Sequence, residues 1–120
     1  MNYEMMKTAV KALDEKKAVN LKVFEIGHLS TLADYLVICN GTSSTQIKAL
    51  ADECEFKLDQ AGYQIDHREG MEAGSWILLD YIDIIVHIYN TDSRKYYDLE
   101  RFWKDGIELN IDDILKESDK

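Results

Sequence analysis

Two carboxylates and an imidazole lie inside a run that is otherwise apolar and aromatic. Residues 76–89 read WILLDYIDIIVHIY, and only Asp80, Asp83 and His87 interrupt the hydrophobic side chains. Closely spaced acids can hold metal ions for phosphoryl transfer, and they can also accept charge-assisted hydrogen bonds from Lys or Arg of a partner. Which chemistry applies depends on the strands that carry these three residues.

The run is rich in β-branched residues and predicts two antiparallel strands, residues 75–80 and 83–90, joined at Tyr81 and Ile82. A two-residue turn sets Leu79 opposite Ile84. However, a tight primed turn needs a positive φ, which Ile82 resists, and a wider turn would shift the pairing. One face is entirely aliphatic and is expected in the core: Ile77, Leu79, Ile84, Val86 and Ile88. The other face carries Trp76, Leu78, Asp80, Asp83, Ile85, His87 and Tyr89.

The second face admits two interpretations. Aromatic rings around a few polar groups are typical of a protein-binding patch, because Trp and Tyr give large contact area with few torsions to freeze. Alternatively, a second layer of helix covers this face and leaves the aspartates at its solvated rim. The pattern alone leaves both open.

The alternative to a protein-binding function is that of a nucleotidyltransferase-like enzyme. Gly41 to Ser43 precede a helix and could hold phosphates, with Asp80 and Asp83 as metal ligands. These acids are three residues apart across a turn, so they do not alternate along one strand, and no Lys or Arg lies near Gly41. The cysteines and histidines also lack ligand-like or nucleophile-like spacing. We therefore expect no catalytic residue, no metal site and no cofactor.

The remaining elements follow from hydrophobic periodicity. A helix is predicted from Ser43 to about Ala61, with Ser43 and Gln46 as a capping box and Gly62 as its stop. A second helix is predicted to begin at Ser93. The other predicted elements are a helix over 2–17 and strands over 19–26, 35–39 and 65–69. This order predicts one α/β (α+β) domain, residues 1–106, with helices packed on a mixed β-sheet. Residues 107–120 form either an edge strand and short helix or a loosely attached acidic tail.

The charge balance narrows the class of partner. Fourteen Lys and Arg against 23 Asp and Glu give a net charge of −9, and the chain has no basic run to neutralise phosphates. Direct binding to DNA or RNA is therefore not expected. The negative net charge is more compatible with a basic protein as the partner than with a nucleic acid. The sequence contains neither a signal pattern nor an apolar segment of membrane-spanning length, so we expect a cytoplasmic protein.

Four segments together carry a family resemblance: DYLVICNGTSSTQIKALAD (34–52), REG (68–70), WILLDYIDIIVHIYN (76–90) and RKYYDLERFW (94–103). In order and with small gaps they resemble the Iojap family of ribosomal silencing factors, over roughly residues 5–104. That family usually has Gly where Ile82 stands here. The resemblance implies a nucleotidyltransferase-like fold without its activity. It also implies binding to a ribosomal protein of the large subunit, which blocks the small subunit and represses translation.

The resemblance also implies a set of partner-binding residues: Trp76, Leu78, Asp80, Tyr81, Asp83, His87 and Tyr89. Glu69, which precedes the hairpin, is expected to extend the acidic rim of this surface. Trp76 and Tyr89 would act as apolar anchors, and His87 would orient Trp76 or a partner group. Asp80 and Asp83 would accept hydrogen bonds from basic side chains. A homodimer is a further expectation, because Tyr97 and Trp103 cannot share one helical face.

Overall fold

The computed structural model describes residues 2–29, 31, 33–70, 76–90 and 106–117. The predicted helix beginning at Ser93 lies outside these residues. In chain order the described elements are α1 (Tyr3–Glu15), β1 (Val19–Glu25), β2 (Tyr35–Asn40), α2 (Ser44–Gln60), β3 (His67–Glu69), β4 (Trp76–Asp80), β5 (Ile84–Tyr89), β6 (Ile107–Leu109) and α5 (Ile111–Lys116). Every predicted element that falls within the described residues is present.

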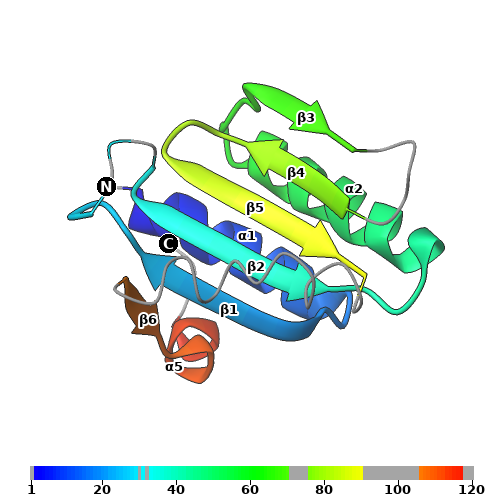
Figure 1. The fold of residues 1–120 in the computed structure, drawn as a ribbon, viewed down its shortest axis with the longest axis horizontal. Coiled ribbons are helices and arrows are strands. Elements are labelled where there is room, and N and C mark those ends of the chain that lie inside the picture. The colour runs from blue at the N-terminus through cyan, green and yellow to red at the C-terminus, as the bar shows by residue number, and fades with distance from the viewer. Residues whose placement is uncertain (1, 30, 32, 71–75, 91–105, 118–120) are drawn as a thin grey trace.

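A six-stranded sheet in the order β3-β4-β5-β2-β1-β6 forms the centre of the fold, and α1 and α2 pack against one of its faces (Figure 1). β2 and β5 run parallel, and every other neighbouring pair is antiparallel. The mixed α+β architecture predicted from the sequence is therefore confirmed.

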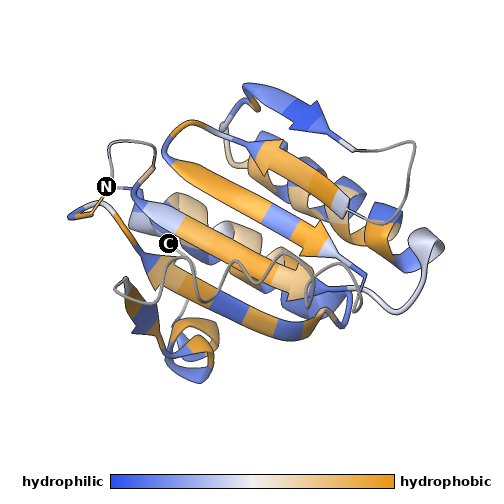
Figure 2. Cartoon of the chain, in the orientation of Figure 1, coloured by the Kyte–Doolittle hydropathy of each residue, from blue (hydrophilic) through white to orange (hydrophobic). Residues whose placement is uncertain are grey.

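The main core lies between the sheet and the two long helices. All five aliphatic residues assigned to one face of the hairpin are fully buried: Ile77, Leu79, Ile84, Val86 and Ile88. They pack in one cluster with α1 residues such as Leu13 and α2 residues such as Leu50. Figure 2 shows hydrophobic residues along β2, β4 and β5, whereas the edge strand β3 is hydrophilic.

Local capping explains where α2 begins and ends. The Ser43 hydroxyl accepts a hydrogen bond from the backbone N–H of Gln46, and Gln46 Oε1 accepts one from the backbone N–H of Thr42, at 3.1 and 2.5 Å. At the other end Gly62 has a φ of +94°, and the N–H groups of Gly62 and Tyr63 donate to the carbonyls of Asp59 and Leu58. This is the Schellman arrangement that glycine favours, as the sequence predicts.

The pairing predicted for the hairpin is wrong by two residues, although its faces are right. The structure pairs Leu79 with Val86 and Ile77 with Ile88. The connection is wider than a two-residue turn, with the Tyr81 N–H donating to the Ile84 carbonyl at 3.0 Å. A shift of two residues keeps every side chain on its own side of the sheet, because side chains alternate along a strand.

Ile82 stores local strain within this wider connection. It is 61% exposed and has a φ of +71°, a conformation that a β-branched residue resists. Substitution Ile82→Gly is therefore expected to raise the free energy of unfolding by about 1 kcal/mol, the relief of left-handed strain exceeding the entropy that glycine loses. Urea denaturation measures the change. Ile82→Ala, which keeps a Cβ, should gain much less, and equal gains in both variants would contradict the explanation.

The C-terminal residues take the more ordered of the two forms left open by the sequence. β6 pairs antiparallel with β1, and the Asn110 side chain accepts a hydrogen bond from the Asp113 N–H to begin α5. Ile114 of α5 is only 2% exposed and joins the main core. Residues 107–116 thus extend the sheet and pack against it. Within the described ranges, no helix combines the length and apolar character needed to cross a membrane.

Candidate functional site

Strand β3 places a histidine and three acids together at one edge of the sheet. The register sets His67 opposite Asp80 and Glu69 opposite Leu78, so these side chains share one face. His67 Nδ1 lies 3.0 Å from Asp66 Oδ2 and 3.7 Å from Asp80 Oδ2, and His67 Nε2 lies 2.9 Å from Glu69 Oε2. We call Asp66, His67, Glu69 and Asp80 the acidic edge.

The acids of this edge change the titration of His67. The hydrogen bond to Asp66 is the largest cause of a raised pKa for His67; desolvation opposes it, and Glu69 and Asp80 act in the same direction as Asp66. The cationic imidazole is thereby favoured among three carboxylates. The edge as a whole remains acidic, because one histidine cannot neutralise three acids.

Arg68 holds the edge strand onto the body of the protein. Its side chain points to the opposite face from His67 and forms ion pairs with Asp52 and Glu55 of α2, the pair with Asp52 at 2.9 Å. The Asp66 N–H also donates to the Asp80 carbonyl at 2.8 Å. The backbone beneath the acidic edge is therefore held from both β4 and α2.

Three rings from β4 and β5 stack beside the acidic edge. Trp76 Nε1 donates a hydrogen bond to His87 Nδ1 at 3.2 Å, and the centroids of these two rings are 6.0 Å apart. The His87 and Tyr89 rings are stacked at 5.8 Å with an interplanar angle of 15°. His87 therefore contacts Trp76, one of the two groups that it was predicted to orient.

Of the eight residues predicted to bind a partner, three are buried. His87 is 8% exposed, and Tyr89 is 1% exposed in a second cluster that includes Phe24, Leu36 and Ile38. Tyr81 is 4% exposed and its ring packs on the helix side in the main core. By contrast, Trp76, Leu78, Asp80 and Asp83 are half-buried and Glu69 is exposed. Whether any of the eight residues contacts a partner stays a prediction.

Burial gives His87 a large pH-dependent effect on stability. Desolvation lowers its pKa from 6.5 to about 4. The unfolded chain therefore binds this proton below pH 6.5 while the folded chain does not, so stability falls as the pH drops through this window. When the pH falls from 7 to 5, we expect the titration of His87 to lower the free energy of unfolding by about 2 kcal/mol.

The variant His87→Asn isolates that effect, because its amide oxygen can replace Nδ1 as the acceptor for Trp76 but does not titrate. Urea denaturation of both proteins at pH 7 and pH 5 should show the natural chain losing about 2 kcal/mol more than the variant. The raised pKa of His67 acts in the opposite direction, stabilising the fold below pH 6.5, but it is present in both proteins and cancels. An equal loss in both proteins would show that His87 does not titrate as described.

The geometry contradicts the alternative enzyme site. Gly41 follows the end of β2 and donates its N–H to the Tyr89 carbonyl at the end of β5. Asp80 and Asp83 flank the opposite end of β5, before Ile84. Because β5 has six residues, the two halves of the proposed site are separated by roughly 17 Å. The turn at Gly41 is a strand-to-helix connection, with Ser43 as the N-cap of α2.

The sequence interpretation did not assign a role to Asp66 and His67. The histidines lack ligand-like spacing in the sequence, so His67 is not predicted to bind a metal. The structure brings Asp66, His67 and Asp80 within ligand-atom separations of 4.8 Å, through strand pairing between segments that are distant in sequence. The register of residues 65–69 against β4 was the missing information. Cys39 and Cys54 are both buried, and burial raises the pKa of the Cys54 thiol.

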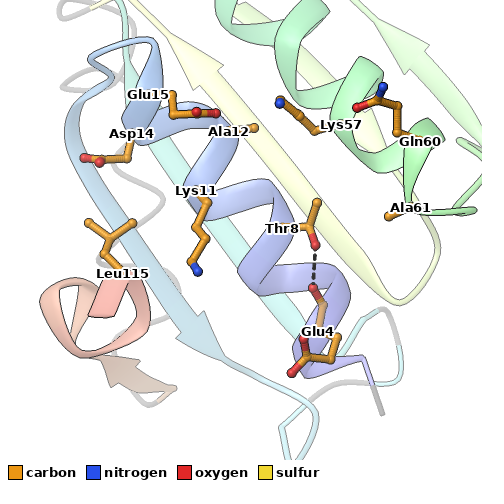
Figure 3. Close-up of a pocket in the computed structure, with 10 residues that line it drawn as sticks. All are labelled: Glu4, Thr8, Lys11, Ala12, Asp14, Glu15, Lys57, Gln60, Ala61 and Leu115. Carbon is orange, nitrogen blue, oxygen red and sulfur yellow. Dashed lines mark hydrogen bonds between the residues drawn. The ribbon is translucent and has the colours of Figure 1, made fainter. Parts of the chain in front are cut away.

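Two surface pockets lie away from the acidic edge. One, of about 570 Å³, lies between α1, α2 and α5, and Figure 3 shows its mixed acidic, basic and small lining residues. Thr8 in its wall donates to the Glu4 carbonyl at 2.9 Å. The other, of about 410 Å³, lies beside α2 and includes Phe56, Tyr63 and Tyr81. Neither contains Asp80 or Glu69, so the partly exposed face of β3 and β4 remains the candidate site.

Comparison with known proteins agrees with the resemblance seen in the sequence. Residues 2–120 match the family model described as "Ribosomal silencing factor during starvation". A ribosomal silencing factor from Halalkalibacterium halodurans is 34% identical over 114 residues, which cover 95% of this chain and 97% of the relative. The chloroplastic Iojap protein of Zea mays is 29% identical over 104 residues, covering 85% of this chain and 45% of that protein.

A solved structure supports the same assignment. A crystal structure of a protein from Chromobacterium violaceum superposes with a TM-score of 0.85 at 35% identity, covering 87% of each chain. The family match extends across the acidic edge, the stacked rings and the C-terminal elements β6 and α5. The chain belongs to the Iojap family of ribosomal silencing factors.

Proposed function

We propose that this protein binds a basic ribosomal protein of the large subunit through the face that β3 and β4 share, and so sterically prevents the small subunit from joining. Translation is repressed because the two subunits cannot associate. The observation that carries the proposal is the acidic edge, which lies beside the partly exposed Trp76 and Leu78 in a chain of this family.

The chemistry of this face suits a cationic protein surface. Glu69, Asp80 and Asp83 can accept charge-assisted hydrogen bonds from Lys or Arg. Leu78 and Trp76 supply apolar area between them, and the side chain of Trp76 is held by His87. Tyr89 and His87 are too buried to serve as anchors, so their role in the proposal is to support Trp76. Tyr81 supports the turn from the core side in the same way.

The net charge of −9 favours protein over RNA at such a site. Phosphates repel an acidic surface, whereas a basic ribosomal protein attracts it, so the charge discriminates between neighbouring targets on the subunit. The proposal therefore excludes direct binding to DNA or to a membrane. It places the protein in the cytoplasm with the ribosomes. A homodimer stays a prediction, since Tyr97 and Trp103 lie outside the described residues.

Silencing by this route needs no chemical step. The protein has only to occupy part of the surface that the small subunit uses, so a catalytic residue or cofactor has no place in the proposal. Occupancy then depends on affinity and concentration alone. The degree of repression should follow the fraction of large subunits that carry the protein.

Sedimentation with purified subunits tests the binding step. The protein should pellet with isolated large subunits and remain in the supernatant with isolated small subunits. Adding salt should weaken the binding, because the proposed contact relies on partly exposed charges. Equal pelleting with both subunits, or pelleting with neither, would overturn the proposal. A titration with free ribosomal RNA should show no binding and serves as the control for charge.

A further inference from the structure

We propose that the acidic edge is also a binding site for a divalent transition-metal ion, with Asp66, His67 and Asp80 as its ligands. The proposal rests on the positions of these side chains and is independent of the proposed ribosomal function. His67 supplies an imidazole nitrogen, and the two aspartates supply one carboxylate oxygen each. One nitrogen and two oxygens form a donor set that zinc and its neighbours in the first transition row accept.

The separations of the two carboxylate oxygens from His67 Nδ1 are close to those around a tetrahedral ion. Bonds of about 2.1 Å in tetrahedral geometry require ligand atoms about 3.4 Å apart. His67 Nδ1 lies 3.0 Å from Asp66 Oδ2 and 3.7 Å from Asp80 Oδ2, on either side of that value. All three ligand atoms lie within 4.8 Å of one another, so side-chain rotation has only to adjust their separations toward about 3.4 Å for one ion to contact all three.

Backbone hydrogen bonds hold Asp80 in a suitable orientation. Its Oδ1 accepts a hydrogen bond from the Ile82 N–H at 2.7 Å, which leaves Oδ2 on the side of His67. The Asp66 N–H donates to the Asp80 carbonyl, and His67 pairs with Asp80 in the ladder between β3 and β4. All three ligands therefore come from backbone positions that are fixed relative to one another.

Glu69 supplies the outer contact that metal-bound histidines usually have. A histidine that binds a metal through one ring nitrogen commonly donates the N–H of the other nitrogen to a carboxylate, which sets its tautomer and orientation. Glu69 Oε2 lies 2.9 Å from His67 Nε2, on the side of the ring away from Asp66 and Asp80. This contact leaves Nδ1 as the nitrogen that faces both aspartates.

Metal binding at this edge would change the charge of the candidate docking surface. A divalent ion offsets the charges of Asp66 and Asp80, and three protein ligands leave at least one coordination position for water or a further donor. Asp80 belongs both to this site and to the predicted partner-binding residues. Occupation by metal and contact of Asp80 with a basic side chain are therefore expected to compete.

Isothermal titration of the full chain, without a histidine tag, with zinc chloride in a non-chelating buffer tests the inference. The natural protein should bind one zinc ion, and magnesium should give no binding heat. His67→Ala should weaken zinc binding at least about 100-fold, and Glu69→Gln should weaken it about tenfold through the outer contact. The matched control His28→Ala, which removes an exposed histidine elsewhere, should bind as the natural protein does.

Circular dichroism of each variant establishes that its fold is retained. The absence of zinc binding to the natural chain would overturn the inference and leave a proton-bearing His67 among carboxylates. Zinc binding that is unchanged in His67→Ala, or lost in His28→Ala, would also overturn it by placing the ion elsewhere. Because the readout is metal binding, either failure leaves the ribosomal proposal intact.

Discussion

Reversing two charges in the double variant Glu69→Lys with Asp83→Lys is expected to weaken binding to large subunits at least about 30-fold. Glu69 is exposed and Asp83 is half-buried, at either end of the face shared by β3 and β4. Replacing an acid that contacts a basic side chain of the partner by Lys removes one favourable contact and adds a repulsion between two positive charges. A loss of about 2 kcal/mol or more follows, which is the stated fold-change. Sedimentation at several protein concentrations measures the affinity.

The control places the same type of substitution at the far edge of the sheet. Glu108 is exposed on β6, which is separated from β3 by the whole width of the sheet. Glu108→Lys should weaken binding less than about threefold, since only the overall charge changes. A loss as large as in the double variant would show that net charge and not the β3–β4 face governs binding. An unchanged affinity in the double variant would contradict the assignment of the face.

The largest stability effect is expected for Gly70→Ala at the end of β3. Gly70 has a φ of +86°, and a Cβ added there would lie 2.0 Å from the carbonyl oxygen of Trp76. That oxygen belongs to the backbone of β4, so it can move only if the pairing between β3 and β4 is disturbed. We expect a loss of about 3 kcal/mol in the free energy of unfolding, at the upper end for a single substitution. Urea denaturation measures it.

Gly62→Ala is the matched control for that substitution. Gly62 also has a positive φ, +94°, but an added Cβ meets no atom within 4 Å. Only the conformational cost then applies, about 1 kcal/mol. If the two variants lost equal stability, the close approach of Gly70 to Trp76 would have no measurable consequence. A large loss in Gly70→Ala alone supports the tight packing that fixes the acidic edge.

Sequence periodicity was sufficient to assign faces within the hairpin. The alternation of aliphatic and polar residues separated Ile77 and Ile88 from Trp76 and Tyr89, and the structure places the two pairs in different clusters. The helix boundaries were predicted equally well, because Ser43 and Gly62 have capping chemistry that is local in sequence. Local signals of this kind do not depend on the rest of the fold.

Pairing between strands and the burial of single residues could not be predicted in the same way. The predicted register rested on a two-residue turn, whereas the connection is wider and shifts the pairing by two residues. The burial of Tyr89 depends on distant segments, with Phe24 of β1 and Leu36 of β2 in the same cluster. The partnership of His67 with Asp80 likewise depends on which strand lies at the edge.

Light scattering of mixed ribosomal subunits tests the central claim most directly. Large subunits are first incubated with the protein, and small subunits are then added while the formation of whole ribosomes is followed. The account predicts that the scattering increase falls in proportion to the protein bound, and that the double variant Glu69→Lys with Asp83→Lys restores the increase at equal concentration. An increase that is undiminished by saturating amounts of the natural protein would contradict the claim that it blocks subunit joining.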